Sequence, residues 1–422
     1  MSHRRKKERK AAETALVFYF DESHKTDFIT IKDDGLINIK NQNESDTSVG
    51  VFIGIPEEKI QIFERRFIEI EERTKRRIGM RPDEELKSTT FEKKHYRNGL
   101  SSFKGSMVEF YTSLIDLLLE MRPVIHISLI SKTEILVYGL LESISVPDNV
   151  DADLKSLMFG LIKYLDTCAG PDAFRALCSA FSVQGFEAFK TTLVEDHLNY
   201  VAEGHDGSHS RGEKEVFNSL MTFLNLCKFS ISSEKTFDFP FVIMFDSLKI
   251  NLYERGLDDR DMRLVIDGDT DQYPESEIFF EKVGYGDSKQ EPMIRVCDHL
   301  AGFLGRMIQS MFEARYCSDS HAGRVNLSGR TLRLDDGWFE LDESRYDLYK
   351  KLYLLFHRDQ RYRLVTMSML YAESPVMFYA LIEFMGTLRN YRIFSRIPPE
   401  FLREMYETFS VDKLVYRLNR TL

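Results

Sequence analysis

The stretch TALVFYFDES, residues 14–23, is nearly continuous in apolar and aromatic side chains until it reaches an acid, Asp21. A run of this kind is typical of a strand that other elements cover on both faces. A carboxylate at the end of so apolar a strand is costly to bury unless it has a partner. Asp21 is therefore either a turn residue that follows the strand or one member of a functional cluster.

The sequence after this strand passes from short apolar runs to helical periodicity, which predicts an α/β chain. Strands come first and a long helix follows them, so the opening is a meander joined to a crossover and not a dinucleotide-binding fold. The expected elements are strands over 27–32 and 48–55, a helix over 57–79 that Gly79 ends, a helix over 104–121 and a strand over 122–131.

From about residue 132 the pattern becomes helical, and a strand pattern returns at FPFVIMFDSL, residues 239–248. A polar, acidic stretch follows, then a helix over 294–312 and a further helical region. The chain is interpreted as a basic arm and an α/β core with two helical additions. The predicted parts are the arm over 1–12, the core over 13–131 and 236–315, a helical insertion over 132–235 and a C-terminal helical region over 340–422.

Composition excludes several classes of protein. Hydrophobic residues make up 43% of the chain and aromatic residues 12%, which is enough for a large core and excludes a mostly disordered protein. No run of eighteen apolar residues exists, so we expect no membrane partner and a cytoplasmic location. Five cysteines without a C-x-x-C pair argue against a zinc ribbon or a disulfide framework. The net charge of −10 does not exclude nucleic acid, because divalent ions neutralise a carboxylate site.

Three further acids occur in settings like that of Asp21. Asp246 ends the apolar run FVIMF, and Asp298 lies within an otherwise apolar helix. Glu85 lies in the segment after the first long helix, two residues before Lys87. Two-metal phosphoryl transfer uses carboxylates from different elements to hold ions roughly 3.5–4 Å apart. Oxygen ligands favour Mg²⁺ or Mn²⁺ over zinc, so the four acids predict a site for one of these ions.

Three short motifs resemble those of a widespread bacterial family, the thirty-eight-hundred domain of unknown function. The motifs are FYFDES, ELKS and the pattern I-x-x-x-D-x-L-A-G over 294–302, in which Arg295 replaces the family's usual Gln and Cys297 its Ala. The family is described as RNase H-like, so the resemblance implies a mixed sheet with helices on both faces. Carried over residue by residue, the resemblance points to Asp21, Glu22, Glu85, Lys87, Asp246 and Asp298, with Ala301 and Gly302 after the last acid.

Two of these residues have alternative roles. Adjacent strand residues face opposite sides, so Glu22 is a metal ligand beside Asp21 only if the strand has already ended. Lys87 could neutralise a phosphate, hold Glu85 in place, or be a solvated surface lysine.

The resulting hypothesis is a nuclease that uses Mg²⁺ or Mn²⁺ to hydrolyse phosphodiester bonds of DNA or RNA, compatible with a role in defence against phage or mobile elements. A metal-bound water would be the nucleophile. The metal ligands would be Asp21, Glu85, Asp246 and Asp298, joined by Glu22 as a candidate ligand and Lys87 as a candidate catalytic residue.

Two alternatives stay open. A nuclease of the P-D…[D/E]-x-K type is one, since Pro82-Asp83 precedes Glu85 and Lys87. Two residues from Asp83 to Glu85 cannot bridge two paired strands, so Asp21 would supply the distant acid, and Lys87 would be indispensable. An inert RNase H-like scaffold could instead bind protein or nucleic acid, because one fold hosts many functions. In either case the apolar C-terminal helices could pack against a second copy in a homodimer.

Overall fold

The computed structural model describes residues 16–23, 46–146, 154–167, 171–202, 211–230, 241–254, 256–257, 262–268, 276–317, 334–357, 363–367 and 373–421. The predicted strand over 27–32 and the predicted basic arm over 1–12 lie outside the described residues.

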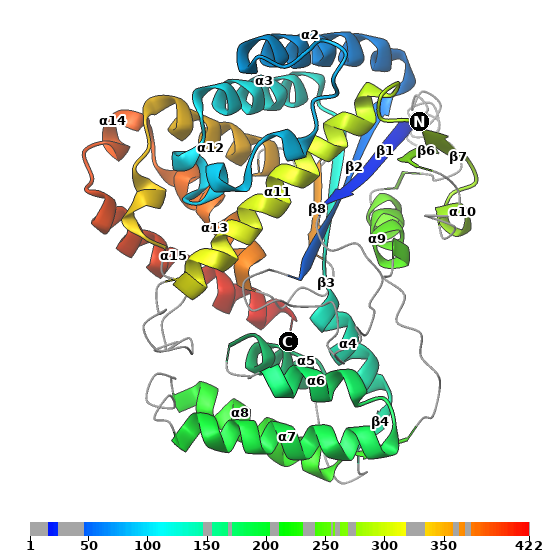
Figure 1. Cartoon of the computed structure of the whole chain (residues 1–422), viewed down its shortest axis with the longest axis vertical. Coiled ribbons are helices and arrows are strands. Elements are labelled where there is room, and N and C mark those ends of the chain that lie inside the picture. The colour runs from blue at the N-terminus through cyan, green and yellow to red at the C-terminus, as the bar shows by residue number, and fades with distance from the viewer. Residues whose placement is uncertain are drawn as a thin grey trace, which may run out of the picture.

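A six-stranded mixed sheet forms the centre of the protein (Figure 1). From one edge to the other its strands are β7 (Val283–Gly286), β6 (Met262–Asp267), β1 (Leu16–Ser23), β2 (Thr47–Pro56), β3 (Val124–Ser131) and β8 (Arg363–Met367). β2 is antiparallel to both of its neighbours, β1 and β3. β6 lies parallel beside β1, β7 lies parallel beside β6, and β8 lies parallel beside β3. The chain is therefore a mixed α/β protein, as predicted.

The side chains of the sheet alternate between two hydrophobic layers. In β1, Val17 and Tyr19 face the larger layer, whereas Phe18 and Phe20 face the smaller one. The smaller layer contains α9 (Phe241–Glu254). In the larger layer α11 packs on β1 and β2, and it crosses the sheet diagonally in Figure 1. The helices of this larger layer include α2 (Ile60–Ile78), α3 (Gly105–Met121), α11 (Pro292–Cys317), α12 (Glu343–His357), α13 (Glu373–Thr387), α14 (Tyr391–Phe394) and α15 (Pro399–Thr421).

Local signals explain the elements of the first half. Buried Phe63 and Phe67 lie one turn apart on α2, and Gly79 ends this helix with a φ of 74°. Only glycine adopts that left-handed conformation without strain, which is why the helix ends there. The predicted strands at β1, β2 and β3 and the predicted helices at α2 and α3 are confirmed.

Two predictions between β3 and α11 are wrong. The segment 239–248, predicted as a strand, contains the start of α9, because Met244, Phe245 and Leu248 cover the sheet from one face of a helix. Short apolar runs fit a buried helix as well as a strand, and tertiary packing decides between them. The missing strand is β6, which lies within the stretch interpreted as polar and acidic.

The C-terminal region is helical as predicted, except for β8. This strand extends the main sheet beside β3, in register from Ile125 paired with Arg363 to Leu129 paired with Met367. Buried Leu352, in α12, belongs to the same hydrophobic layer as the sheet residues. The described residues after 340 therefore contribute to the main core, and the prediction of a helical region is wrong at β8.

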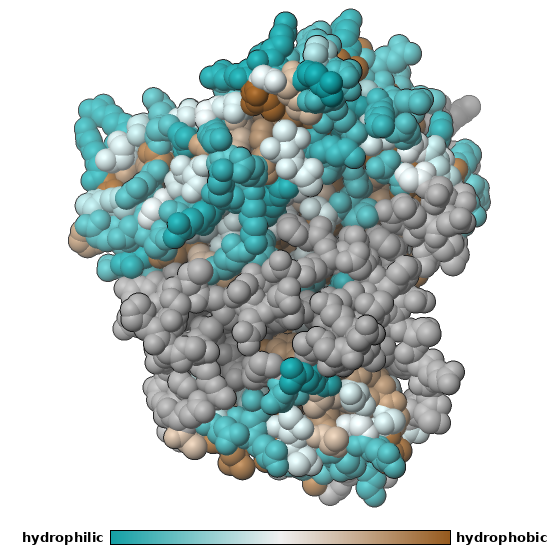
Figure 2. Space-filling model, in the orientation of Figure 1, coloured by the Kyte–Doolittle hydropathy of each residue, from teal (hydrophilic) through white to brown (hydrophobic). Residues whose placement is uncertain are grey.

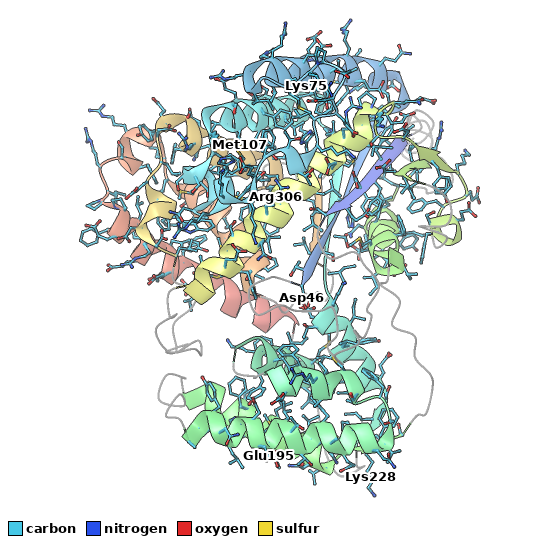
Figure 3. The ribbon with its side chains drawn as sticks, viewed as in Figure 1. Asp46, Lys75, Met107, Glu195, Lys228 and Arg306 are labelled. Carbon is cyan, nitrogen blue, oxygen red and sulfur yellow. The ribbon has the colours of Figure 1, made fainter. Side chains whose placement is uncertain are left out.

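A second group of helices surrounds a hydrophobic cluster of its own below the sheet in Figure 1. A buried acid, Asp46, ties this group to the sheet, because its carboxylate accepts hydrogen bonds from Ser131 Oγ (2.9 Å) and Thr133 N (2.8 Å) (Figure 3). The helical pattern agrees with the prediction, whereas the boundaries of an insertion stay a prediction. The group consists of α4 (Lys132–Glu142), α5 (Leu154–Thr167), α6 (Pro171–Ser179), α7 (Val183–Ala202) and α8 (Arg211–Leu226), with the short strands β4 (Ile144–Ser145) and β5 (Lys228–Phe229).

Hydrophilic residues cover most of the described surface that Figure 2 shows. In the part of the chain that the structure describes, every helix is too short or too polar to cross a bilayer.

Candidate metal centre

The carboxyl ends of β1 and β6 bring two acids side by side. Parallel pairing sets Phe20 opposite Ile266, so the next residues along the two strands are Asp21 and Asp267. Neighbouring strands lie roughly 4.8 Å apart. Phe20 and Ile266 face the layer of α9, so alternation directs Asp21 and Asp267 toward the layer of α11.

A third acid approaches from α11. The Sγ of Cys297 donates to a main-chain oxygen of β1 at 3.3 Å, which seats the helix on the strand. Asp298 is the next residue of the helix, and its charge acts on Asp21. Burial is the largest cause that raises the pKa of Asp21 well above 3.8, and the negative charges of Glu22, Asp298 and Asp267 raise it further. The three aspartates therefore share one electrostatic site.

The segment before η2 (Ser88–Thr90) adds a fourth acid. Burial raises the pKa of Asp267, and the charge of Glu85 raises it further, whereas Lys87 and hydrogen bonds from main-chain N–H groups lower it. Glu85 has a side-chain exposure of only 13%, and its Oε2 lies 3.6 Å from the Nζ of Lys87. Lys87 is 55% exposed, so it reaches both Glu85 and solvent.

Asp298 and Gly302 hold this segment against α11. The N–H and Oγ–H of Ser88 donate to the two oxygens of Asp298 at 2.8 and 2.7 Å. A Cβ at Gly302 would lie 2.4 Å from both the Cβ and the Oγ of Ser88. Gly302, one of the two small residues that follow Asp298 in sequence, therefore allows α11 to approach this segment closely.

Two other side chains of α11 fix the same segment. His299 is fully buried and donates from Nε2 to the carbonyl of Leu86 at 2.9 Å, and burial lowers its pKa, which keeps it neutral. Arg306, labelled in Figure 3, donates from Nη1 to the carbonyl of Ser88 at 2.8 Å and also to that of Phe91. The α11 motif is thus a scaffold for the E-x-K segment as well as the source of an acid.

Asp246 does not join this cluster. It lies on α9, whose Phe245 ring packs 5.2 Å from the ring of Phe20 on the opposite face of the sheet. The sheet therefore separates Asp246 from Asp298. The prediction that Asp246 lies at the end of a core strand is wrong. The acid that ends a core strand is Asp267, at the end of β6.

Sequence reasoning missed Asp267, although a signal was present. MRLVIDG, residues 262–268, is a short apolar run that ends in an acid, like LVFYFDE at β1. The acidic residues around it hide the run when composition is averaged over a longer window.

Glu22 is directed away from the cluster. β1 continues past it, because Ser23 still pairs with Val49 of β2. Alternation then places Glu22 on the face of α9, opposite Asp21. Its charge still raises the pKa of Asp21 because the two residues are adjacent.

The paired strands that a P-D…[D/E]-x-K site requires are absent from residues 81–91, which form turns and short 3-10 segments. Asp83 is 75% exposed and lies 3.9 Å from Arg81 across a surface ion pair. It is therefore not held in a buried site.

The carboxylate oxygens of these acids suit a hard cation, although they do not converge on a single position for one. Across the described residues, no three His, Cys, Asp or Glu side chains are gathered tightly enough to hold one ion together. Asp298 instead accepts from Ser88, and the Oδ1 of Asp21 accepts from the N–H of Glu22 at 2.7 Å. A carboxylate whose pKa is raised by burial and by neighbouring negative charges, as that of Asp21 is, suits Mg²⁺ or Mn²⁺, because a divalent ion removes the repulsion.

In comparisons with known proteins, no family model, curated protein or solved structure matches this chain. The resemblance to the thirty-eight-hundred domain family therefore stays a prediction.

Proposed function

We propose that this protein is a divalent-metal-dependent nuclease built on an RNase H-like sheet. In such a sheet a meander of three strands is extended by two parallel strands beside the first. The order β3-β2-β1-β6-β7, with β2 antiparallel to its neighbours, supports this proposal. The helices α4–α8 are then an insertion after the third strand, and β8 extends the sheet beyond it.

The observation that carries the proposal is the parallel register that puts Asp21 next to Asp267, with the charge of Asp298, from α11, acting on Asp21. Like charges this close oppose one another's ionisation, which costs stability unless a cation is bound. Perturbed carboxylates gathered from separate elements are more typical of functional sites than of structural ones.

The proposed ligands are Asp21, Asp267 and Asp298, with Glu85 at the edge of the set. When bound, the ions would supply an activated water and stabilise the leaving oxygen of a phosphodiester. Lys87 would keep Glu85 oriented and offer its exposed ammonium to a substrate phosphate. Neither Asp246 nor Glu22 belongs to this set.

The test compares four proteins in Mn²⁺ titrations followed by thermal unfolding and by cleavage of labelled DNA and RNA. They are the parent, the variants Asp21→Asn and Asp267→Asn, and the matched control Asp246→Asn. At an ion concentration of 100 times Kd, binding should stabilise the parent and the control by about 2.7 kcal/mol. The two site variants should lose both this stabilisation and cleavage.

Two outcomes contradict the proposal. If the parent neither binds Mn²⁺ nor cleaves either nucleic acid, the chain is the inert scaffold. If Asp246→Asn loses binding as Asp267→Asn does, the ligand set is wrong.

A further inference from the structure

A buried ion pair joins α2 to α11 beside the candidate metal centre. The Nε and Nη2 of Arg295 donate to the two oxygens of Glu71 at 2.8 and 2.7 Å. Arg295 is 8% exposed and Glu71 2%. A fork-to-carboxylate pair fixes the plane of the guanidinium, so its third nitrogen has a defined direction.

That third nitrogen is directed at the loop between β7 and α11. The Nη1 of Arg295 donates to the carbonyl of Ser288 at 2.5 Å and to that of Lys289 at 3.4 Å. The loop is a tight turn, in which the N–H of Glu291 donates to the carbonyl of Asp287 at 2.9 Å. Arg295 therefore fixes the turn from its carbonyl side.

The same turn supports Asp267 from its amide side. The N–H of Ser288 donates to Oδ1 of Asp267 at 3.2 Å, and this hydrogen bond lowers the pKa that burial raises. The contacts form a chain from Glu71 through Arg295 and Ser288 to the acid.

A buried pair is a poor source of stability, because desolvation offsets most of the attraction between the charges. A role in fixing geometry explains its presence better. We propose that Arg295, held by Glu71, is a positioning residue that orients Asp267 for metal binding through Ser288. This inference rests on the proposed function and adds to it a residue that touches neither metal nor substrate.

The test measures the Mn²⁺ affinity of folded protein by calorimetry. Arg295→Lys keeps a charge but cannot contact Glu71 and the turn together, so its Kd should rise roughly 10- to 100-fold, as for other residues that orient metal ligands. The matched control is Arg66→Lys. Arg66 lies on α2, the helix that carries Glu71, and makes a two-bond pair with Glu120, at 2.6 and 2.7 Å, but its side chain is 36% exposed. Its Kd should be unchanged.

A second variant separates positioning from folding. The double substitution Glu71→Leu with Arg295→Met removes both charges, so neither is left buried and unpaired, and the fold should persist. Its Kd should still rise at least 10-fold, and the segment containing Ser288 should exchange its amide hydrogens faster than in the parent.

The outcomes are distinguishable. If the parent binds Mn²⁺ and the folded double variant binds it equally well, the positioning role is overturned while the proposed function stands. If the parent itself binds no Mn²⁺, the proposed function fails and the inference fails with it.

Discussion

Replacing Gly302 by alanine tests how closely α11 approaches the E-x-K segment. The new Cβ would lie 2.4 Å from the Cβ and Oγ of Ser88, so one of the two elements must move. Arg306 holds the carbonyl of Ser88, and the Ser88 hydroxyl is already bonded to Asp298, so movement breaks existing contacts.

Overpacking costs about 1–3 kcal/mol, and losing a hydrogen bond to a carboxylate costs about 1.5–3 kcal/mol. The better helix propensity of alanine offsets about 1 kcal/mol of this loss in stability. We therefore expect Gly302→Ala to lower the free energy of unfolding by roughly 1.5–5 kcal/mol.

Urea denaturation of the metal-free protein measures this loss. Gly105→Ala is the control, because Gly105 begins α3 and a Cβ there meets nothing within 4 Å. It should be neutral or stabilising. Adding Ser88→Gly to Gly302→Ala removes the overlap and should restore the packing part of the loss. A Gly302→Ala protein as stable as the parent would refute the close approach.

Two further predictions concern charge and pH. The pKa of Asp21 is raised in the folded protein, so the metal-free fold loses stability as pH rises above 3.8. The variant Asp21→Asn should therefore raise Tm at neutral pH by a few degrees. A variant that melts below the parent at neutral pH would contradict this expectation. Burial lowers the pKa of His126 from 6.5 to about 3, so stability falls as pH drops below 6.5. His126→Gln should reduce the loss between pH 7 and about pH 4.5 by about 2–3 kcal/mol in denaturant titrations, whereas an unchanged loss would exclude a buried neutral histidine.

Local sequence patterns predict the first half of the core well. β1 and β2 are apolar enough to need cover on both faces, and α2 carries Phe63 and Phe67 at helical spacing before Gly79. These patterns depend only on residues that are close in sequence, so they predict the elements correctly without knowledge of the tertiary structure.

The second half depends on packing that local patterns do not contain. FVIMF fits a strand or a buried helix, and it becomes α9 because the smaller layer of the sheet has to be covered. β6 has only six residues, and its neighbours in sequence are acidic, yet it fills the place beside β1. The sequence pattern therefore pointed to Asp246 as the strand-end acid, whereas the acid at the end of the strand is Asp267.

The sequence also could not show how the acids are held. Each of the three aspartates accepts hydrogen bonds from the main chain: Asp21 from Glu22, Asp267 from Ser288 and Gly268, and Asp298 from Ser88. Such bonds depend on backbone conformation and leave no side-chain motif. A carboxylate has about four acceptor positions, so one or two bonds fix its orientation and leave others for an ion. The sequence motifs therefore indicate which acids are candidates. The turn at Ser288 and the segment at Ser88 determine whether those acids can bind a metal together.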